Sequence, residues 1–260
     1  MTISAESWHK YVEALYKVNS KASEELNKML GRGFNYNNPE DMKRLVDYAY
    51  GISTKYGEAA AELACQMYDA VGLASGMLLE PATPAELASY GEVAKTVYGT
   101  AKSSQNLEEM LSAVTRLVKK AGQDTTLHNA MRDGAQFAWI PSGDTCAFCI
   151  TLASRGWQTA SKNTIKNGHA EHIHSNCDCA YAVRFNSNTQ VKGYDPSVYE
   201  AMYYSADLDG EKATPKNRIN ALRREFYAKN KAEINANKRI NYAERQERLN
   251  SSEAEETKVN

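Results

Sequence analysis

Apolar residues recur at three- and four-residue steps through the first half of the chain, which is the spacing of amphipathic helices. One stripe runs from Trp8 to Met29, and another follows Pro39, a residue that suits the first turn of a helix. The same spacing continues over residues 58–71 and 107–131. We therefore predict a helical domain over residues 1–133.

Two local signals divide this helical half further. The dipeptide Tyr56-Gly57 is expected to break or bend the second helix, because glycine disfavours helical backbone. The sequence Thr83-Pro84-Ala85-Glu86 has the composition of a helix start. Its threonine can cap the helix, its proline fits the first turn, and its glutamate completes a capping box. We therefore expect another helix to begin at Thr83.

The pattern changes at Gly134, where short segments replace the helical spacing. Residues 137–141 have the pattern of a strand closed by a proline, and residues 181–185 alternate like a second strand. A short helical piece follows the first strand, whereas residues 158–176 are polar and are expected to form a loop. We predict a small α+β unit over residues 134–200.

After this unit the chain becomes polar and basic. Residues 211–250 hold 11 Lys/Arg and 5 Asp/Glu, a net charge of +6, whereas the whole chain carries −1. Sparse apolar positions predict a helix with a narrow buried face over residues 215–249. We assign residues 201–250 to a C-terminal basic helical segment and expect residues 251–260 to be a disordered tail.

Composition places the chain among ordinary globular proteins, since 42% of its residues are hydrophobic and 24% are charged. The chain contains no run of about 18 uncharged apolar residues, and we therefore expect no transmembrane helix. The N-terminus lacks the basic segment and apolar run of a signal peptide. We expect the protein to fold in the cytoplasm of the cell that makes it and to have no membrane partner.

Five cysteines carry the candidate chemistry. Cys65 lies in the alanine-rich helical stretch, where it is expected to act as a small hydrophobic residue. The other four form two close pairs, Cys146-x-x-Cys149 and Cys177-x-Cys179. Disulfides are not expected in a reducing cytoplasm, where clustered cysteines more often bind metal.

Zinc prefers four soft or borderline ligands in a tetrahedron, and a site closed by four protein ligands is structural. His174 is the expected imidazole ligand, because it precedes Cys177 by three residues, the spacing of a turn. His169 and His172 are also close. We predict one structural zinc per chain. The candidate metal ligands, from which four are drawn, are Cys146, Cys149, His174, Cys177 and Cys179.

Other interpretations of this cluster are weaker. The cysteines could be free thiols in a small core, with the histidines on a solvated loop. A redox pair is disfavoured because no βαβ pattern surrounds Cys146-x-x-Cys149. The sequence His169-Ala-Glu171-His172 resembles the His-x-Glu of zinc deaminases, but the partner Pro-Cys-x-x-Cys should follow it, and here the pair precedes it and lacks the proline.

A family resemblance rests on the same residues. The string from Trp139 to Gly156, which contains Cys-Ala-Phe-Cys and Leu-Ala-Ser-Arg-Gly, followed by His174-Ser-Asn-Cys177-Asp-Cys179, resembles the minor head proteins of tailed phages related to the Mu F head-morphogenesis protein. It is most similar to the branch found in phages and prophages of Gram-positive bacteria. Supporting segments lie at 56–64, 124–133 and 193–195, so that the resemblance covers roughly residues 45–200.

Two positions depart from the family pattern. Ile173 stands where members often have a tyrosine, and Asp178 stands where an arginine is usual between the last two cysteines. Neither position changes the number of metal ligands. The acidic Asp178 argues against a nucleic-acid contact by this part of the site.

The resemblance implies a structural minor capsid protein without enzymatic activity, present in few copies inside the virion head near the portal. Its expected partner is a portal or capsid protein. The alternative is a zinc-containing nucleic-acid-binding module that contacts packaged DNA through the basic segment 211–250. A prophage-linked toxin or other enzyme is the third hypothesis. It is disfavoured because residues 186–260 are too short and polar to hold a second catalytic core.

Overall fold

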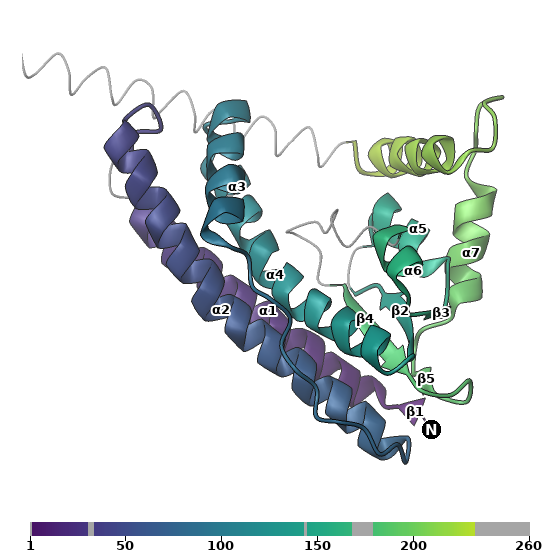
Figure 1. The fold of residues 1–260 in the computed structure, drawn as a ribbon. Coiled ribbons are helices and arrows are strands. Elements are labelled where there is room, and N and C mark those ends of the chain that lie inside the picture. The colour runs from purple at the N-terminus through teal and green to yellow at the C-terminus, as the bar shows by residue number, and fades with distance from the viewer. Residues whose placement is uncertain (1, 31–33, 143–144, 168–178, 232–260) are drawn as a thin grey trace, which may run out of the picture. The chain divides into compact units, whose positions relative to one another are not determined.

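The computed structural model describes residues 2–30, 34–142, 145–167 and 179–231 (Figure 1). The chain divides into two compact units. The first contains residues 1–145 and 149–200, and the second contains residues 146–148 and the chain from Ala201 onward. Four long helices and two small sheets make up most of the first unit.

The long helices form a bundle in which α2 packs against each of the other three helices, and α4 also contacts α1 and α3. Figure 1 shows α1, α2 and α4 running alongside one another. Their shared core is apolar, with Leu26, Leu45, Val93 and Val114 completely buried. The mostly helical fold predicted from the apolar spacing is thereby confirmed. The four helices are α1 (Ala5–Leu30), α2 (Pro39–Ala74), α3 (Tyr90–Ser103) and α4 (Leu107–Arg132).

Helix α2 begins as its sequence predicts, with Pro39 in the first turn and the Asn38 side chain accepting the backbone N–H groups of Glu40 and Asp41. The expected break at Gly57 is wrong, because α2 continues through this residue for 36 residues in all. A Cβ at Gly57 would lie 3.2 Å from Leu87 Cδ2 and 3.4 Å from Ala121 Cβ. Close packing thus explains this glycine and outweighs its low helix propensity.

The helix expected to begin at Thr83 is also absent. Residues 77–89 have no regular secondary structure, and α3 begins only at Tyr90, where Ser89 and Glu92 form a capping box. The backbone N–H of Thr83 donates to Asn129 Oδ1 at 3.0 Å, and that of Ala85 donates to Thr125 Oγ1 at 3.0 Å. Buried side chains of α4 therefore satisfy backbone groups that the capping pattern had assigned to a helix.

The larger sheet is antiparallel, with β2 between β3 and β4. Strands β2 and β4 match the two strands predicted from sequence. The stretch 158–176, expected to be loop, contains β3 and the short helix α6 as far as residue 167, and its remainder lies outside the described residues. A separate parallel pair joins β1 and β5. The strands are β1 (Thr2–Ile3), β2 (Gln136–Ile140), β3 (Gln158–Thr159), β4 (Ala180–Arg184) and β5 (Gln190–Val191), and α6 is Lys162–Asn167.

Three further helical segments complete the described chain. Helix α5 (Ala147–Ala153) is the short helix predicted after the first strand, and α7 (Pro196–Ser205) was not predicted. Residues 215–231 are helical, in agreement with the predicted helix over 215–249. The remainder of that helix and the predicted tail 251–260 lie outside the described residues.

Candidate metal centre

Two of the predicted metal ligands lie side by side. The sulfur atoms of Cys149, on α5, and Cys179, just before β4, are 3.5 Å apart, and both side chains are buried. In a tetrahedral zinc site with Zn–S bonds of 2.3 Å, two ligand sulfurs are about 3.8 Å apart. The pair therefore has the spacing and the donor chemistry of two thiolates on one zinc ion.

The register of the sheet brings these cysteines together. Ile140, the last residue of β2, is paired with Ala180, the first residue of β4. The chain leaving β2 therefore starts next to Cys179 and reaches Cys149 within nine residues. The backbone N–H of Ser142, on this connection, donates to Cys179 Sγ at 3.4 Å. A hydrogen bond of this kind lowers the charge density on a thiolate and favours its ionised, metal-binding form.

Of the remaining predicted ligands, only Cys146 is among the residues that the structure describes. Cys146 directly precedes α5 and is half-buried. His174 and Cys177 lie outside the described residues, as do His169 and His172. Within the described part of the chain, no group of three His, Cys, Asp or Glu side chains has the arrangement of a metal site. The structure thus places one pair of candidate ligands together.

Cys65 differs from this pair in its environment. It is 5% exposed on α2, within the helical bundle. Burial raises the pKa of its thiol to about 11, with smaller contributions from the nearby carboxylates of Glu62 and Asp69. Its thiol therefore stays protonated at neutral pH, which makes it a poor metal ligand.

Aromatic packing covers the sheet beside the cysteine pair. Tyr181 lies between Phe137 and Trp139, with ring-centre distances of 5.4 and 4.7 Å. All three side chains are buried, and this burial raises the pKa of Tyr181 well above its usual value. The cysteines therefore adjoin a dry core that can hold a closed structural site.

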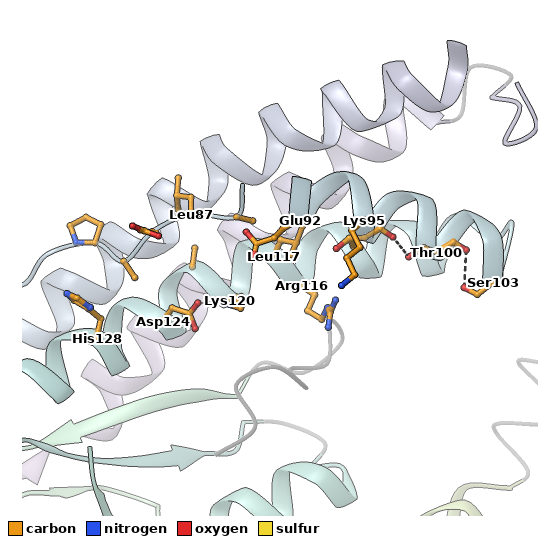
Figure 2. A pocket seen from close by; sticks show the side chains of 17 residues that line it. Leu87, Glu92, Lys95, Thr100, Ser103, Arg116, Leu117, Lys120, Asp124 and His128 are labelled. Carbon is orange, nitrogen blue, oxygen red and sulfur yellow. Dashed lines mark hydrogen bonds and ion pairs between the residues drawn. The ribbon is translucent and has the colours of Figure 1, made fainter. Parts of the chain in front are cut away.

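A groove with mixed charge lies on the other side of α4, between α3 and the 77–89 segment, and encloses about 1040 Å³ (Figure 2). Lys120 forms an ion pair with Asp124 inside it. The pKa of Asp124 is raised mainly by burial, although Lys120 acts in the opposite direction. Glu92 and Lys95 also line the groove, so that charges of both signs offset one another. The arrangement favours neither an anion nor a cation.

Two groups that contact Cys179 were not predicted from the sequence. One is the backbone N–H of Ser142, which no side-chain pattern could reveal. The other is Gln123 on α4, whose Nε2 donates to the Cys179 carbonyl oxygen at 3.4 Å. A polar residue among buried apolar positions such as Val118 and Leu127 was the available signal.

The fold and this site define a mostly helical protein with a small sheet and, at one end of that sheet, a pair of adjacent thiols. By comparison with known families, the chain belongs to the VG15 family, since the family model described as VG15 protein matches residues 2–206. This is a family of phage proteins, and the resemblance drawn from sequence is confirmed at that level. No curated protein and no solved structure matches the chain.

The family match includes the helical bundle, both sheets and α7, and it ends before the basic helical residues 215–231.

Among the residues that the structure describes, no helix has the length and apolar character needed to cross a membrane.

Proposed function

We propose that this protein is a structural minor head protein of a tailed phage or prophage, related to the Mu F head-morphogenesis protein. It would reside inside the head near the portal and dock on a portal or capsid protein. Membership of a phage protein family supports this proposal, as do the motif residues around Cys146-x-x-Cys149. The observation that carries it is the buried pair of sulfurs 3.5 Å apart, located where that motif predicts a metal.

The proposed zinc is structural. Cys146, Cys149 and Cys179 would hold it together with His174 or Cys177, so that protein ligands fill the tetrahedron. Zinc bound in this way contributes its binding free energy to folding, because the unfolded chain has no formed site. Cys179 adjoins β4 and Cys149 is on α5, and a shared ion would therefore join these two elements. In this proposal the protein has no enzymatic activity.

Virion analysis tests the proposal directly. Particles of the phage that encodes this chain should contain the protein in few copies per head, retained after the tails are removed. Quantitative mass spectrometry of purified heads measures this number. A protein that is abundant in infected or induced cells but absent from purified heads would rule out the structural role.

One observation favours the second candidate function, contact with packaged DNA. The helical residues 215–231 hold six Lys/Arg and one acidic residue. Arg218 is engaged within its own unit, where its guanidinium lies 4.8 Å from the Tyr204 ring and donates to the carbonyl oxygens of Tyr203 and Tyr204. Arg224 is also engaged there, since it pairs with Glu211 and donates to the Asp207 carbonyl oxygen. The other cations are exposed and could neutralise phosphates without reading sequence. They are Lys216, Arg223, Lys229 and Lys231.

A further inference from the structure

A buried glutamine connects the helical bundle to the second half of the candidate metal centre. Gln123 lies on α4 and is only 5% exposed. Its Nε2 donates to the carbonyl oxygen of Cys179, a residue 56 positions further along the chain. Cys179 therefore receives one hydrogen bond on its carbonyl oxygen from Gln123 and another on its sulfur from the Ser142 N–H.

The orientation of the Gln123 amide follows from this contact. The reverse orientation would place Oε1 against the Cys179 carbonyl, so that two acceptors would face each other. Oε1 itself has no hydrogen-bond partner within the described part of the protein, and neither does Asn19 Oδ1 on α1. Both residues and Cys179 line a cavity of about 30 Å³, which has room for a water molecule that could donate to both oxygens.

Packing alone does not explain this residue. Val118, Ala121 and Leu127 on the same helix are buried and apolar, and an apolar side chain at position 123 would avoid the cost of burying an amide. The amide lies where it meets the backbone of a candidate ligand. Hydrogen bonds around a metal site orient its ligands, and they do so more precisely when the donor is on a rigid element such as a long helix.

We propose that Gln123 is a positioning residue for the metal centre, which holds the Cys179 backbone so that its sulfur lies beside that of Cys149 in the zinc-bound site. This inference rests on the proposed zinc site and goes beyond it, because it makes the affinity of the site depend on the helical bundle. The juxtaposition that carries it is Gln123 Nε2 on Cys179 O, with Cys179 Sγ 3.5 Å from Cys149 Sγ.

The test compares zinc affinity in three full-length proteins by competition with a chelating dye. Gln123→Met keeps the length of the side chain and removes the donor, and it should weaken zinc binding by about 10- to 100-fold, the usual effect of losing a partner of a metal ligand. Thr115→Val is the matched control. Thr115 is also buried on α4, but among the residues that the structure describes it donates only to backbone carbonyl groups of its own helix. It should leave zinc affinity within about twofold of the parent.

Cobalt substitution distinguishes positioning from general destabilisation. The Co²⁺ form of Gln123→Met should have altered visible absorption bands, since these bands report the tetrahedral geometry of the ligands. The Thr115→Val form should keep the parent spectrum even if it is less stable. A Gln123→Met protein with the parent's zinc affinity and cobalt spectrum would overturn the inference and leave the zinc proposal intact. A parent protein that binds no zinc would overturn both.

A second measurement needs no variant and covers the case in which Gln123→Met does not fold. In the ¹⁵N-labelled parent protein, the side-chain amide signals of Gln123 should shift when zinc is removed by a chelator. The side-chain amide of Gln66, which donates to Glu62 on the surface of α2, should not shift. Unchanged Gln123 signals in a protein that has released its zinc would overturn the positioning role.

Discussion

The side-chain amide of Asn129 pairs with the backbone of Thr83 much as a neighbouring strand would. Asn129 Nδ2 donates to the Thr83 carbonyl oxygen at 2.8 Å, and Asn129 Oδ1 accepts the Thr83 N–H at 3.0 Å. The asparagine is completely buried on α4. Arg132 extends this contact, since its guanidinium donates to the carbonyl oxygens of Glu80 and Pro81. Together these side chains fix the 77–89 segment along the helical bundle.

This pairing predicts unequal effects on stability for substitutions at its two residues. Asn129→Leu should lower the free energy of unfolding by about 2–3 kcal/mol, because it leaves the Thr83 backbone groups without partners. Thr83→Ala should change it by less than about 0.5 kcal/mol, since the hydrogen bonds to Asn129 use only the Thr83 backbone. Urea denaturation measures both values. A loss of about 1 kcal/mol in Thr83→Ala would instead indicate the helix cap expected from sequence.

Glycine substitutions in the bundle should differ in sign. A Cβ at Gly122 would lie 3.0 Å from the Ala60 carbonyl oxygen, a backbone atom that cannot move away easily. Gly122→Ala should therefore lower stability by about 1–3 kcal/mol despite the better helix propensity of alanine. At Gly51, on α2, a Cβ meets nothing within 4 Å, so that Gly51→Ala should raise stability by up to about 1 kcal/mol. Thermal denaturation of both variants tests the close approach of α2 and α4.

Metal analysis of the purified protein should find about one zinc per chain, because four ligands make one closed site. Cys146→Ser and Cys149→Ser should each abolish zinc binding. Cys65→Ser is the control and should retain zinc, since Cys65 is a buried protonated thiol in the bundle. Folded protein that is free of metal without chelator treatment would contradict the assignment, and so would loss of zinc in Cys65→Ser.

Chelation should unfold the metal-stabilised part of the chain selectively. Hydrogen exchange should accelerate over residues from about Trp139 to Phe185, which include the end of β2 and all of β4, because the site contributes its binding free energy to their folding. The far-ultraviolet helical signal should remain largely unchanged, since α1, α2 and α4 share an apolar core of their own. Uniform acceleration throughout the bundle would mean that the two parts fold as one cooperative unit.

A related variant tests whether the zinc does chemistry. Glu171→Gln should alter neither zinc content nor thermal stability, because four protein ligands leave no position for a reactive water. Two findings would contradict a structural zinc. One is a coordination sphere of three protein ligands and a water. The other is a folded, zinc-loaded Glu171→Gln protein that has lost a hydrolytic or deaminating activity of the parent.

The basic segment predicts a salt dependence. If residues 211–250 bind DNA, log affinity should fall linearly with log salt, with a slope of about −0.9 for each phosphate neutralised. Arg223→Glu combined with Lys229→Glu should weaken binding strongly. The same charge change at Lys43 and Lys95, exposed on α2 and α3, should have little effect. Filter binding at two salt concentrations measures this, and equal losses in the two double variants would exclude a dedicated DNA-binding helix.

Local patterns predicted three of the four long helices and the two longest strands. Helices α1, α2 and α4 follow from apolar spacing, because an amphipathic helix must place one continuous stripe against a core wherever its partners lie. Strands β2 and β4 follow from short apolar segments bounded by Gly134, Pro141 and polar residues. The helix start at Pro39 was also predicted, since the preference of proline for the first turn is a local one.

Tertiary contacts decided what those patterns could not. Thr83-Pro84-Ala85-Glu86 has the residues of a helix start, yet it is not helical because Asn129 and Thr125, which are 40 or more positions away from the groups they contact, satisfy its backbone. Gly57 has the composition of a break, yet α2 continues because Leu87 and Ala121 require the space a side chain would fill. In both cases distant side chains outweigh a local preference of about 1 kcal/mol.

For the cysteine site too, some features followed from the sequence and others only from the tertiary structure. The sequence alone supplied the ligand types and the pairs Cys146-x-x-Cys149 and Cys177-x-Cys179, because metal chemistry requires particular atoms at close spacing. The structure decided that Cys149 and Cys179 lie together, because the pairing of Ile140 with Ala180 brings two distant segments to one end of the sheet. It also decided that Gln123 reaches Cys179, since only the packing of α4 beside β4 places a helix residue against that backbone.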